Sequence, residues 1–216
     1  MKNLWFLIGP PGSKWSSFAN LITLSIDNID LSDHTSERYF QHTEFITHEG
    51  AYFGPGFGMG EQWHQTEYIK RENILSDISK VWDLNNDKIK LIKSHVLSLH
   101  LPLLRSAFPD SKFILVTRPV DRCLRGWAGA GGFEKILYPD YKKYYKNLEV
   151  LQQKVSQEHY AIDAYIDQNN LKKVGYNAVE FIREFSIDQS VINTQRFSSL
   201  DAHLCSYRDV YFAIEN

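Results

Sequence analysis

The chain has 216 residues, 43% of them hydrophobic, and a formal net charge of −2. This length and apolar content predict a single domain with a large core, and the absence of a basic excess argues against broad nucleic-acid binding. Two cysteines, Cys123 and Cys205, are too few for a disulfide framework and indicate a reducing compartment. We find no signal-peptide pattern and no stretch near the roughly 20 apolar residues of a transmembrane helix, so we expect a cytoplasmic protein without membrane contact.

The first predicted elements are a buried strand over residues 3–9, a tight turn, and a helix over residues 16–26. Gly9 and Gly12 let the backbone turn sharply and let a ligand approach closely. Ser16 and Ser17 are expected to cap the helix. A turn of this kind directs backbone N–H groups toward one point, which favours a bound phosphate or sulfate. An ordinary strand-to-helix turn is the alternative interpretation.

Residues 50–63 contain glycines interleaved with aromatic residues. The aromatic residues in this stretch are Tyr52, Phe53, Phe57 and Trp63. A regular helix or strand does not tolerate this density of glycine. We therefore expect a loop, either a substrate loop beside the first turn or a plain surface loop.

The rest of the chain alternates between helical and strand patterns. Helices are predicted over 66–83, 98–107, 119–128, 140–168 and 177–185, and strands over 89–94, 112–117 and 190–194. The pattern after residue 194 is ambiguous. Such alternation predicts an α/β fold, a three-layer sandwich with a central parallel sheet. Ligands bind at the carboxyl ends of such strands, so we expect one crevice where three strand ends converge.

One candidate ligand for that crevice is ATP on a Walker loop, Gly-x4-Gly-Lys-Ser/Thr. Counting from Gly9, the second glycine and the lysine should occupy positions 14 and 15, where the chain has Lys14 and Trp15. The hydroxyl that would hold magnesium directly after the lysine is also missing. A P-loop nucleotide kinase is therefore a secondary hypothesis.

The loop reads Pro11-Gly12-Ser13-Lys14-Trp15-Ser16-Ser17. It resembles the first loop of the sulfotransferase family, which reads Pro-Lys-Ser-Gly-Thr-Thr-Trp, although here a glycine and a lysine have exchanged places. The resemblance implies that the loop holds the 5′-phosphosulfate of the co-substrate 3′-phosphoadenosine 5′-phosphosulfate. The residues implied in this binding are Pro11, Gly12, Ser13, Lys14, Trp15, Ser16 and Ser17.

The second stretch, Leu91-Ile92-Lys93-Ser94-His95, is similar to the family's strand ending in Ile-Lys-Thr-His. In cytosolic members this histidine is the catalytic base, which implies that His95 accepts the proton of the attacking hydroxyl. Lys14 and Lys93 would assist at the leaving phosphate. Some branches use a glutamate as the base, which makes Glu61 the reserve candidate. A histidine at a strand end can equally be structural.

The third stretch is a strand running into Arg118-Pro119-Val120-Asp121, similar to the family's Arg-Asn-Pro-x-Asp-x3-Ser segment. The resemblance implies that Arg118 pairs with the 3′-phosphate. Arg125 stands where the family has its serine, and an arginine can also donate to a phosphate. An ion pair between Arg118 and Asp121 at a helix start is the alternative. The family's late Arg-Lys-Gly segment has no clear counterpart after residue 190.

The three stretches lie in roughly the first 130 residues, and together they imply a P-loop NTPase-like sulfotransferase fold in one domain, residues 1–216. The implied reaction is in-line transfer of a sulfonate group to a hydroxyl or amine of a small-molecule or carbohydrate acceptor, with no metal required. The aromatic residues of the glycine-rich loop are expected to line the acceptor pocket. A third hypothesis is a non-catalytic nucleotide-binding module derived from the fold.

Overall fold

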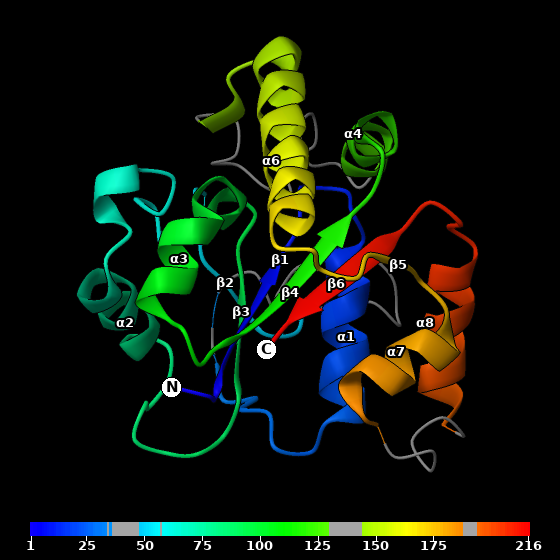
Figure 1. Ribbon diagram of the computed structural model, residues 1–216, viewed down its shortest axis with the longest axis horizontal. Helices are drawn as coiled ribbons and strands as arrows, with labels where there is room; N and C mark the ends of the chain where they lie inside the picture. The colour runs from blue at the N-terminus through cyan, green and yellow to red at the C-terminus, as the bar shows by residue number, and fades with distance from the viewer. Residues whose placement is uncertain (34, 36–47, 57, 130–143, 188–193) are drawn as a thin grey trace.

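Six strands form one central sheet in the described part of the chain, and helices cover both of its faces (Figure 1). The computed structural model describes residues 1–33, 35, 48–56, 58–129, 144–187 and 194–216. The elements in chain order are β1 (Leu4–Ile8), α1 (Trp15–Ser25), β2 (Ala51–Tyr52), the 3-10 helix η2 (Thr66–Tyr68), α2 (Arg71–Ser79), β3 (Lys90–Lys93), the 3-10 helix η3 (Val96–His100), α3 (Leu101–Ala107), β4 (Lys112–Thr117), α4 (Val120–Gly129), α6 (Leu148–Gln168), β5 (Val174–Gly175), α7 (Ala178–Phe185), α8 (Gln195–Cys205) and β6 (Tyr211–Glu215).

The strand order is β2-β3-β1-β4-β6-β5, and the sheet is mixed. The first four strands are parallel, whereas β6 runs antiparallel to β4, with Tyr211 opposite Thr117 and Glu215 opposite Phe113. The prediction of an all-parallel sheet is therefore wrong at this edge. The reason is that α8 ends near the carboxyl ends of the parallel strands, so that β6 begins there and has to run back (Figure 1).

The first strand explains the layering of the core, because all five of its residues are buried. Trp5 and Leu7 belong to a cluster that includes side chains of α1, α7 and α8 on one face of the sheet. Leu4, Phe6 and Ile8 belong to a cluster with α2, α3 and the C-terminal half of α6 on the other face. A strand covered on both faces needs a continuous apolar run, and the structure is the predicted α/β sandwich.

The predicted helix over 66–83 is broken in the structure. Lys70 has an extended backbone, φ −124° and ψ 147°, which separates η2 from α2. Asp77 on α2 explains why the chain keeps this shape, since its Oδ2 accepts hydrogen bonds from Trp63 Nε1 at 2.9 Å and Tyr68 OH at 3.1 Å. These bonds tie the preceding segment to α2 instead of extending the helix.

Two other predicted elements fall partly outside the described residues, namely 140–143 of the long helix and 190–193 of the last predicted strand. Thr194 belongs to a helix start, because its side chain accepts a hydrogen bond from Phe197 N and caps α8. Among the described helices, none is both long enough and apolar enough to cross a membrane.

Candidate functional site

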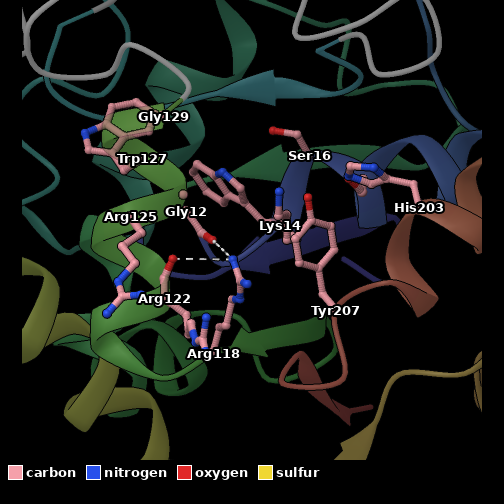
Figure 2. A pocket seen from close by; sticks show the side chains of 13 residues that line it. Gly12, Lys14, Ser16, Arg118, Arg122, Arg125, Trp127, Gly129, His203 and Tyr207 are labelled. Carbon is pink, nitrogen blue, oxygen red and sulfur yellow. Dashed lines mark hydrogen bonds between the residues drawn. The ribbon is translucent and has the colours of Figure 1, made fainter.

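A pocket of about 490 Å³ opens at the carboxyl ends of β1 and β4, between the β1–α1 loop, α4 and the end of α8 (Figure 2). Most of the residues proposed from the sequence to bind the donor lie in its wall. The described lining residues are Gly12, Lys14, Trp15, Ser16, Ser17, Arg118, Arg122, Arg125, Gly126, Trp127, Gly129, His203 and Tyr207.

The start of α1 forms one wall of this pocket. The N-cap residue is Lys14, which has a left-handed backbone at φ 77° and makes no side-chain capping hydrogen bond. The prediction that Ser16 and Ser17 cap the helix is wrong, because both lie within its first turn. The first amides of a helix have no acceptors within the helix. The start of α1 therefore presents N–H groups suited to an anion.

Gly12 allows α4 to approach the loop closely. Its φ of 82° is left-handed, and a Cβ on it would overlap the carbonyl oxygen of Cys123 and lie 2.9 Å from Trp127 N. On the α4 side, a Cβ on Gly126 would lie 3.2 Å from the Gly12 carbonyl oxygen. Backbone packing without intervening side chains therefore fixes the distance between the loop and the side chains of α4.

Lys14 lines the pocket. Its Nζ lies 3.9 Å from the centre of the Tyr207 ring, a cation–π contact (Figure 2). Nearby His203 also lines the pocket, and burial together with the positive charge of Lys14 lowers its pKa. This shift favours a neutral imidazole near pH 7.

Arg118 lies in the pocket wall but is only 6% exposed. Its Nε lies 3.1 Å from Asp209 Oδ1, and its Nη1 donates weakly to the carbonyl oxygens of Gly12 and Arg122, both at 3.4 Å (Figure 2). The expected alternative, a pair with Asp121 at the helix start, is replaced by the pair with Asp209. Arg118 thus ties together the loop, α4 and the chain preceding β6.

Arg122 and Arg125 are the exposed cations of the pocket. Arg122 Nε lies 3.7 Å from Asp121 Oδ2 and 3.6 Å from Asp209 Oδ2, and Arg125 Nη2 lies 3.8 Å from Asp121 Oδ2. Exposed pairs at such distances are weak, so both guanidinium groups remain available to a ligand. Sequence reasoning missed Arg122, although its spacing of three residues from Arg125 would have put both on one side of a helix.

The lining is strongly positive in a chain with a net charge of −2. It includes one lysine and three arginines, and no aspartate or glutamate is among the described lining residues. Pro11 and Ser13 belong to the same loop but are buried and do not line the pocket. Ser13 N donates a hydrogen bond to Pro10 O at 3.1 Å. The chemistry that this lining favours is the binding of a ligand with several anionic groups.

The strand end at Lys93 and His95 lies apart from this pocket. Both side chains are fully buried, and neither is among the lining residues. His95 Nδ1 lies 2.7 Å from Oε1 of Glu158, which is also fully buried. The link to the pocket is Trp15, whose ring lies edge-on to His95 at 6.3 Å between centroids and which also lines the pocket.

Aromatic rings enclose the pair of His95 and Glu158. Tyr52 stacks on the imidazole at 5.9 Å with an interplanar angle of 11°, and Tyr145 stacks at 6.2 Å and 27°. Sequence reasoning missed Glu158. The available signal was an acidic residue in the buried stripe of α6, between Val155 and Ile162.

Glu61, the reserve base, closes its own glycine-rich loop, because its Oε1 accepts hydrogen bonds from Gly56 N at 3.0 Å and Gly58 N at 2.9 Å. The aromatic residues expected to line an acceptor pocket lie elsewhere than predicted. Tyr52, Phe53 and Trp63 are fully buried core residues, with the last two stacked at 4.6 Å, and Phe57 is outside the described residues.

Comparisons of the chain with protein-family models, with curated proteins and with solved structures find no match. Within the described part of the chain, no group of three or more His, Cys, Asp or Glu side chains is arranged to hold a metal ion. The cationic pocket and the three sequence stretches are therefore the features of the chain that bear on its function.

Proposed function

We propose that the protein is a sulfotransferase with a P-loop-like fold, and that the cationic pocket binds 3′-phosphoadenosine 5′-phosphosulfate. The observation that supports this most strongly is the lining itself: four cationic side chains and an uncapped helix start face one pocket, and no carboxylate is among the described lining residues. The acceptor would be a hydroxyl or amine of a small molecule or a carbohydrate, as the resemblance implies.

The two sides of the pocket suit two separate anionic groups. On one side, Lys14, Ser16 and the first amides of α1 would hold the 5′-phosphosulfate. On the other side, the arginines of α4 would hold the 3′-phosphate, with Arg118 contributing from its buried position. ATP carries its phosphates in one contiguous chain, so a donor with phosphates at both ends of its ribose matches this division better.

In the proposed reaction the acceptor oxygen or nitrogen attacks sulfur and forms the new bond. The bond between sulfur and the bridging oxygen breaks in line, and adenosine 3′,5′-bisphosphate leaves. Lys14 and the amides of the loop would stabilise the charge that develops on the leaving phosphate. His95 would take the acceptor's proton, which requires the Trp15 ring to turn aside when the acceptor binds, because that ring contacts both His95 and the pocket.

A non-catalytic binding module is the second candidate function. The observation that favours it is the complete burial of His95 and Lys93, which leaves both side chains outside the pocket wall. In this alternative the pocket would bind the same class of ligand, and the pair of His95 and Glu158 would serve stability alone.

Calorimetric titration with adenosine 3′,5′-bisphosphate, and separately with magnesium and ATP, tests the proposal. We expect the bisphosphate to bind more tightly than ATP. Arg122→Ala should weaken bisphosphate binding by about tenfold, since a charge-assisted hydrogen bond contributes about 1.5 kcal/mol or more. Arg183→Ala, an exposed arginine on α7 outside the pocket, is the matched control and should leave affinity unchanged.

Absence of bisphosphate binding by the wild-type protein would overturn the proposal, and preferential binding of ATP would favour the kinase. Transfer of labelled sulfonate from the donor to a panel of phenols, amines and sugars then separates the enzyme from the module. His95→Asn should abolish transfer while leaving bisphosphate affinity within twofold.

A further inference from the structure

The turn between α8 and β6, residues 206–210, contacts three cationic side chains of the pocket. Each comes from a different element: Lys14 from the β1–α1 loop, Arg118 from the end of β4, and Arg122 from α4. The contacts are made by only two residues of the turn, Tyr207 and Asp209. In Figure 2 the Tyr207 ring lies beside Lys14, and the Arg118 side chain extends toward Gly12 of the β1–α1 loop.

Tyr207 contacts two of these cations. The Lys14 ammonium lies 3.9 Å and the Arg118 guanidinium carbon 4.8 Å from the ring centre. An aromatic ring attracts a cation through its quadrupole and carries no net charge. The ring therefore restricts where both side chains can lie without itself neutralising their charge.

Asp209 contacts the two arginines through different oxygens. Oδ1 lies 3.1 Å from Arg118 Nε, and Oδ2 lies 3.6 Å from Arg122 Nε. Because the carboxylate engages the Nε edge of Arg118, the Nη edge faces the loop and α4, where Nη1 reaches the Gly12 carbonyl oxygen. Arg118 Nη2 donates no hydrogen bond to any residue that the structure describes.

The turn is itself held in place. Tyr207 N donates to Leu204 O at 2.9 Å at the end of α8, and Tyr176 N donates to Val210 O at 2.9 Å. Leu204 and Val210 are buried in the core cluster beneath α8. Tyr207 and Asp209 therefore project from a fixed backbone.

We propose that Tyr207 and Asp209 are positioning residues that hold Lys14, Arg118 and Arg122 in place for a ligand with two separated phosphate groups. The identity of that ligand rests on the proposed function. A lysine or arginine side chain loses up to about 2 kcal/mol of rotamer entropy when it is immobilised. Cations that the turn already restrains lose less on binding, so the turn strengthens binding in addition to any contact that Tyr207, itself a lining residue, makes with the ligand.

The test measures dissociation constants for adenosine 3′,5′-bisphosphate and for inorganic phosphate in paired variants. Tyr207→Leu removes the ring, and we expect bisphosphate binding to weaken by about tenfold. Tyr207→Phe keeps the ring and should stay within about twofold of wild type. Tyr160→Leu, on the exposed surface of α6, is the control for loss of a tyrosine. Inorganic phosphate engages fewer cations and should lose less affinity than the bisphosphate.

Asp209→Ala tests the contacts of the turn with Arg118 and Arg122. We expect bisphosphate binding about fivefold weaker, with recovery in Asp209→Glu, although removal of a negative charge alone would strengthen anion binding. If Tyr207→Leu and Asp209→Ala both bind as wild type does, or if Tyr207→Phe is as weak as Tyr207→Leu, the positioning role is refuted. If wild type itself fails to bind the bisphosphate, it is the proposed function that fails.

Discussion

The pocket around Lys14 and the cluster around His95 both lie at the carboxyl ends of the parallel strands, yet the first is open and the second is closed. The ends of β1 and β4 lie between α4 and α8, where cationic side chains face a pocket of about 490 Å³. The end of β3 lies against α6, whose Glu158 contacts His95 in the interior. The parallel strands bring the candidate residues to one end of the sheet, but the covering helices decide which of them a ligand can reach.

The two regions also differ in the partners of their charged side chains. In the open pocket, Lys14 lies against the neutral Tyr207 ring, and the contacts of Arg122 and Arg125 with Asp121 are long, so these three cations stay available to an anion. Arg118 is the exception, because it is buried and pairs with Asp209 at 3.1 Å. In the closed cluster, His95 and Glu158 are committed to each other at 2.7 Å. We therefore expect substitutions in the closed cluster to lower stability rather than bisphosphate affinity, with loss of transfer in addition where His95 is replaced, and substitutions of pocket cations to act mainly on binding.

The largest effect is expected for Glu158→Ala, which removes one partner of the buried pair. We expect the free energy of unfolding to fall by about 3–5 kcal/mol, since His95 loses its hydrogen-bond partner in the interior and a cavity remains. Urea unfolding followed by circular dichroism measures this change. Glu149→Ala, exposed near the start of the same helix, should cost less than about 1 kcal/mol. A loss below 1 kcal/mol in Glu158→Ala would show that the closed cluster does not contribute to folding as expected.

Gly12→Ala tests the closest backbone contact of the open pocket. The left-handed backbone costs about 1–2 kcal/mol for a residue with a Cβ, and the overlap with Cys123 O adds a similar amount, so we expect about 2–4 kcal/mol in total. Gly58→Ala is the matched control: its φ is +77°, close to the +82° of Gly12, but nothing lies within 4 Å of the added Cβ. Thermal unfolding of both variants separates the two contributions. Equal losses would contradict the packing argument.

The fold was predictable where one stretch of sequence carried the whole signal. The apolar runs of β1 and β4 were visible as buried strands, and the sharp turn at Gly12 followed from glycine's access to positive φ. The direction of β6 was not predictable, because it depends on where α8 ends in space. The break at Lys70 was equally invisible, since it depends on tertiary hydrogen bonds to Asp77.

The part of the site that directly follows a predicted strand could be predicted from the sequence. Lys14, Arg118 and Arg125 were identified as candidates and line the pocket. Tyr207 was missed, because it lies about 90 residues beyond Arg118 in a stretch with no clear pattern, and only the fold brings the two together. The burial of His95 was missed for the same reason: the covering glutamate lies on a helix far along the chain.

A buried ion pair at the amino end of β3 shows that burial alone does not decide whether an interior carboxylate is charged. Asp30 is 3% exposed, and its Oδ2 lies 3.1 Å from Lys90 Nζ. Burial opposes its ionisation, but the hydrogen bonds from Ser32 and the charge of Lys90 outweigh it and lower the pKa of Asp30 from 3.8 to about 2. A carboxylate with a lowered pKa stabilises the fold above about pH 4, and this contribution is lost as the pH falls from about 4 to about 2.

Asp30→Asn should therefore abolish about 2 kcal/mol of pH-dependent stability. The difference between wild type and variant in free energy of unfolding should shrink as the pH falls from 4 to 2, as measured by urea titrations at each pH. Asp87→Asn, which replaces an exposed aspartate near the same end of the sheet, is the control for removal of a surface carboxylate. A constant difference for Asp30→Asn would mean that the hydrogen bonds to Ser32 and the pair with Lys90 do not favour the carboxylate.

The smallest effect on stability is expected for Arg125→Ala, at the rim of the open pocket. Its side chain is 75% exposed, and its contact with Asp121 is 3.8 Å long, so the free energy of unfolding should change by less than about 0.5 kcal/mol. Bisphosphate binding should nevertheless weaken about threefold, since one cation facing the ligand is lost. Urea unfolding and calorimetry on the same preparation measure both. A variant that loses stability but keeps its affinity would contradict a binding role for Arg125. Its contact with Asp121 would then be structural, and Arg122 would be the exposed arginine of α4 that faces the ligand.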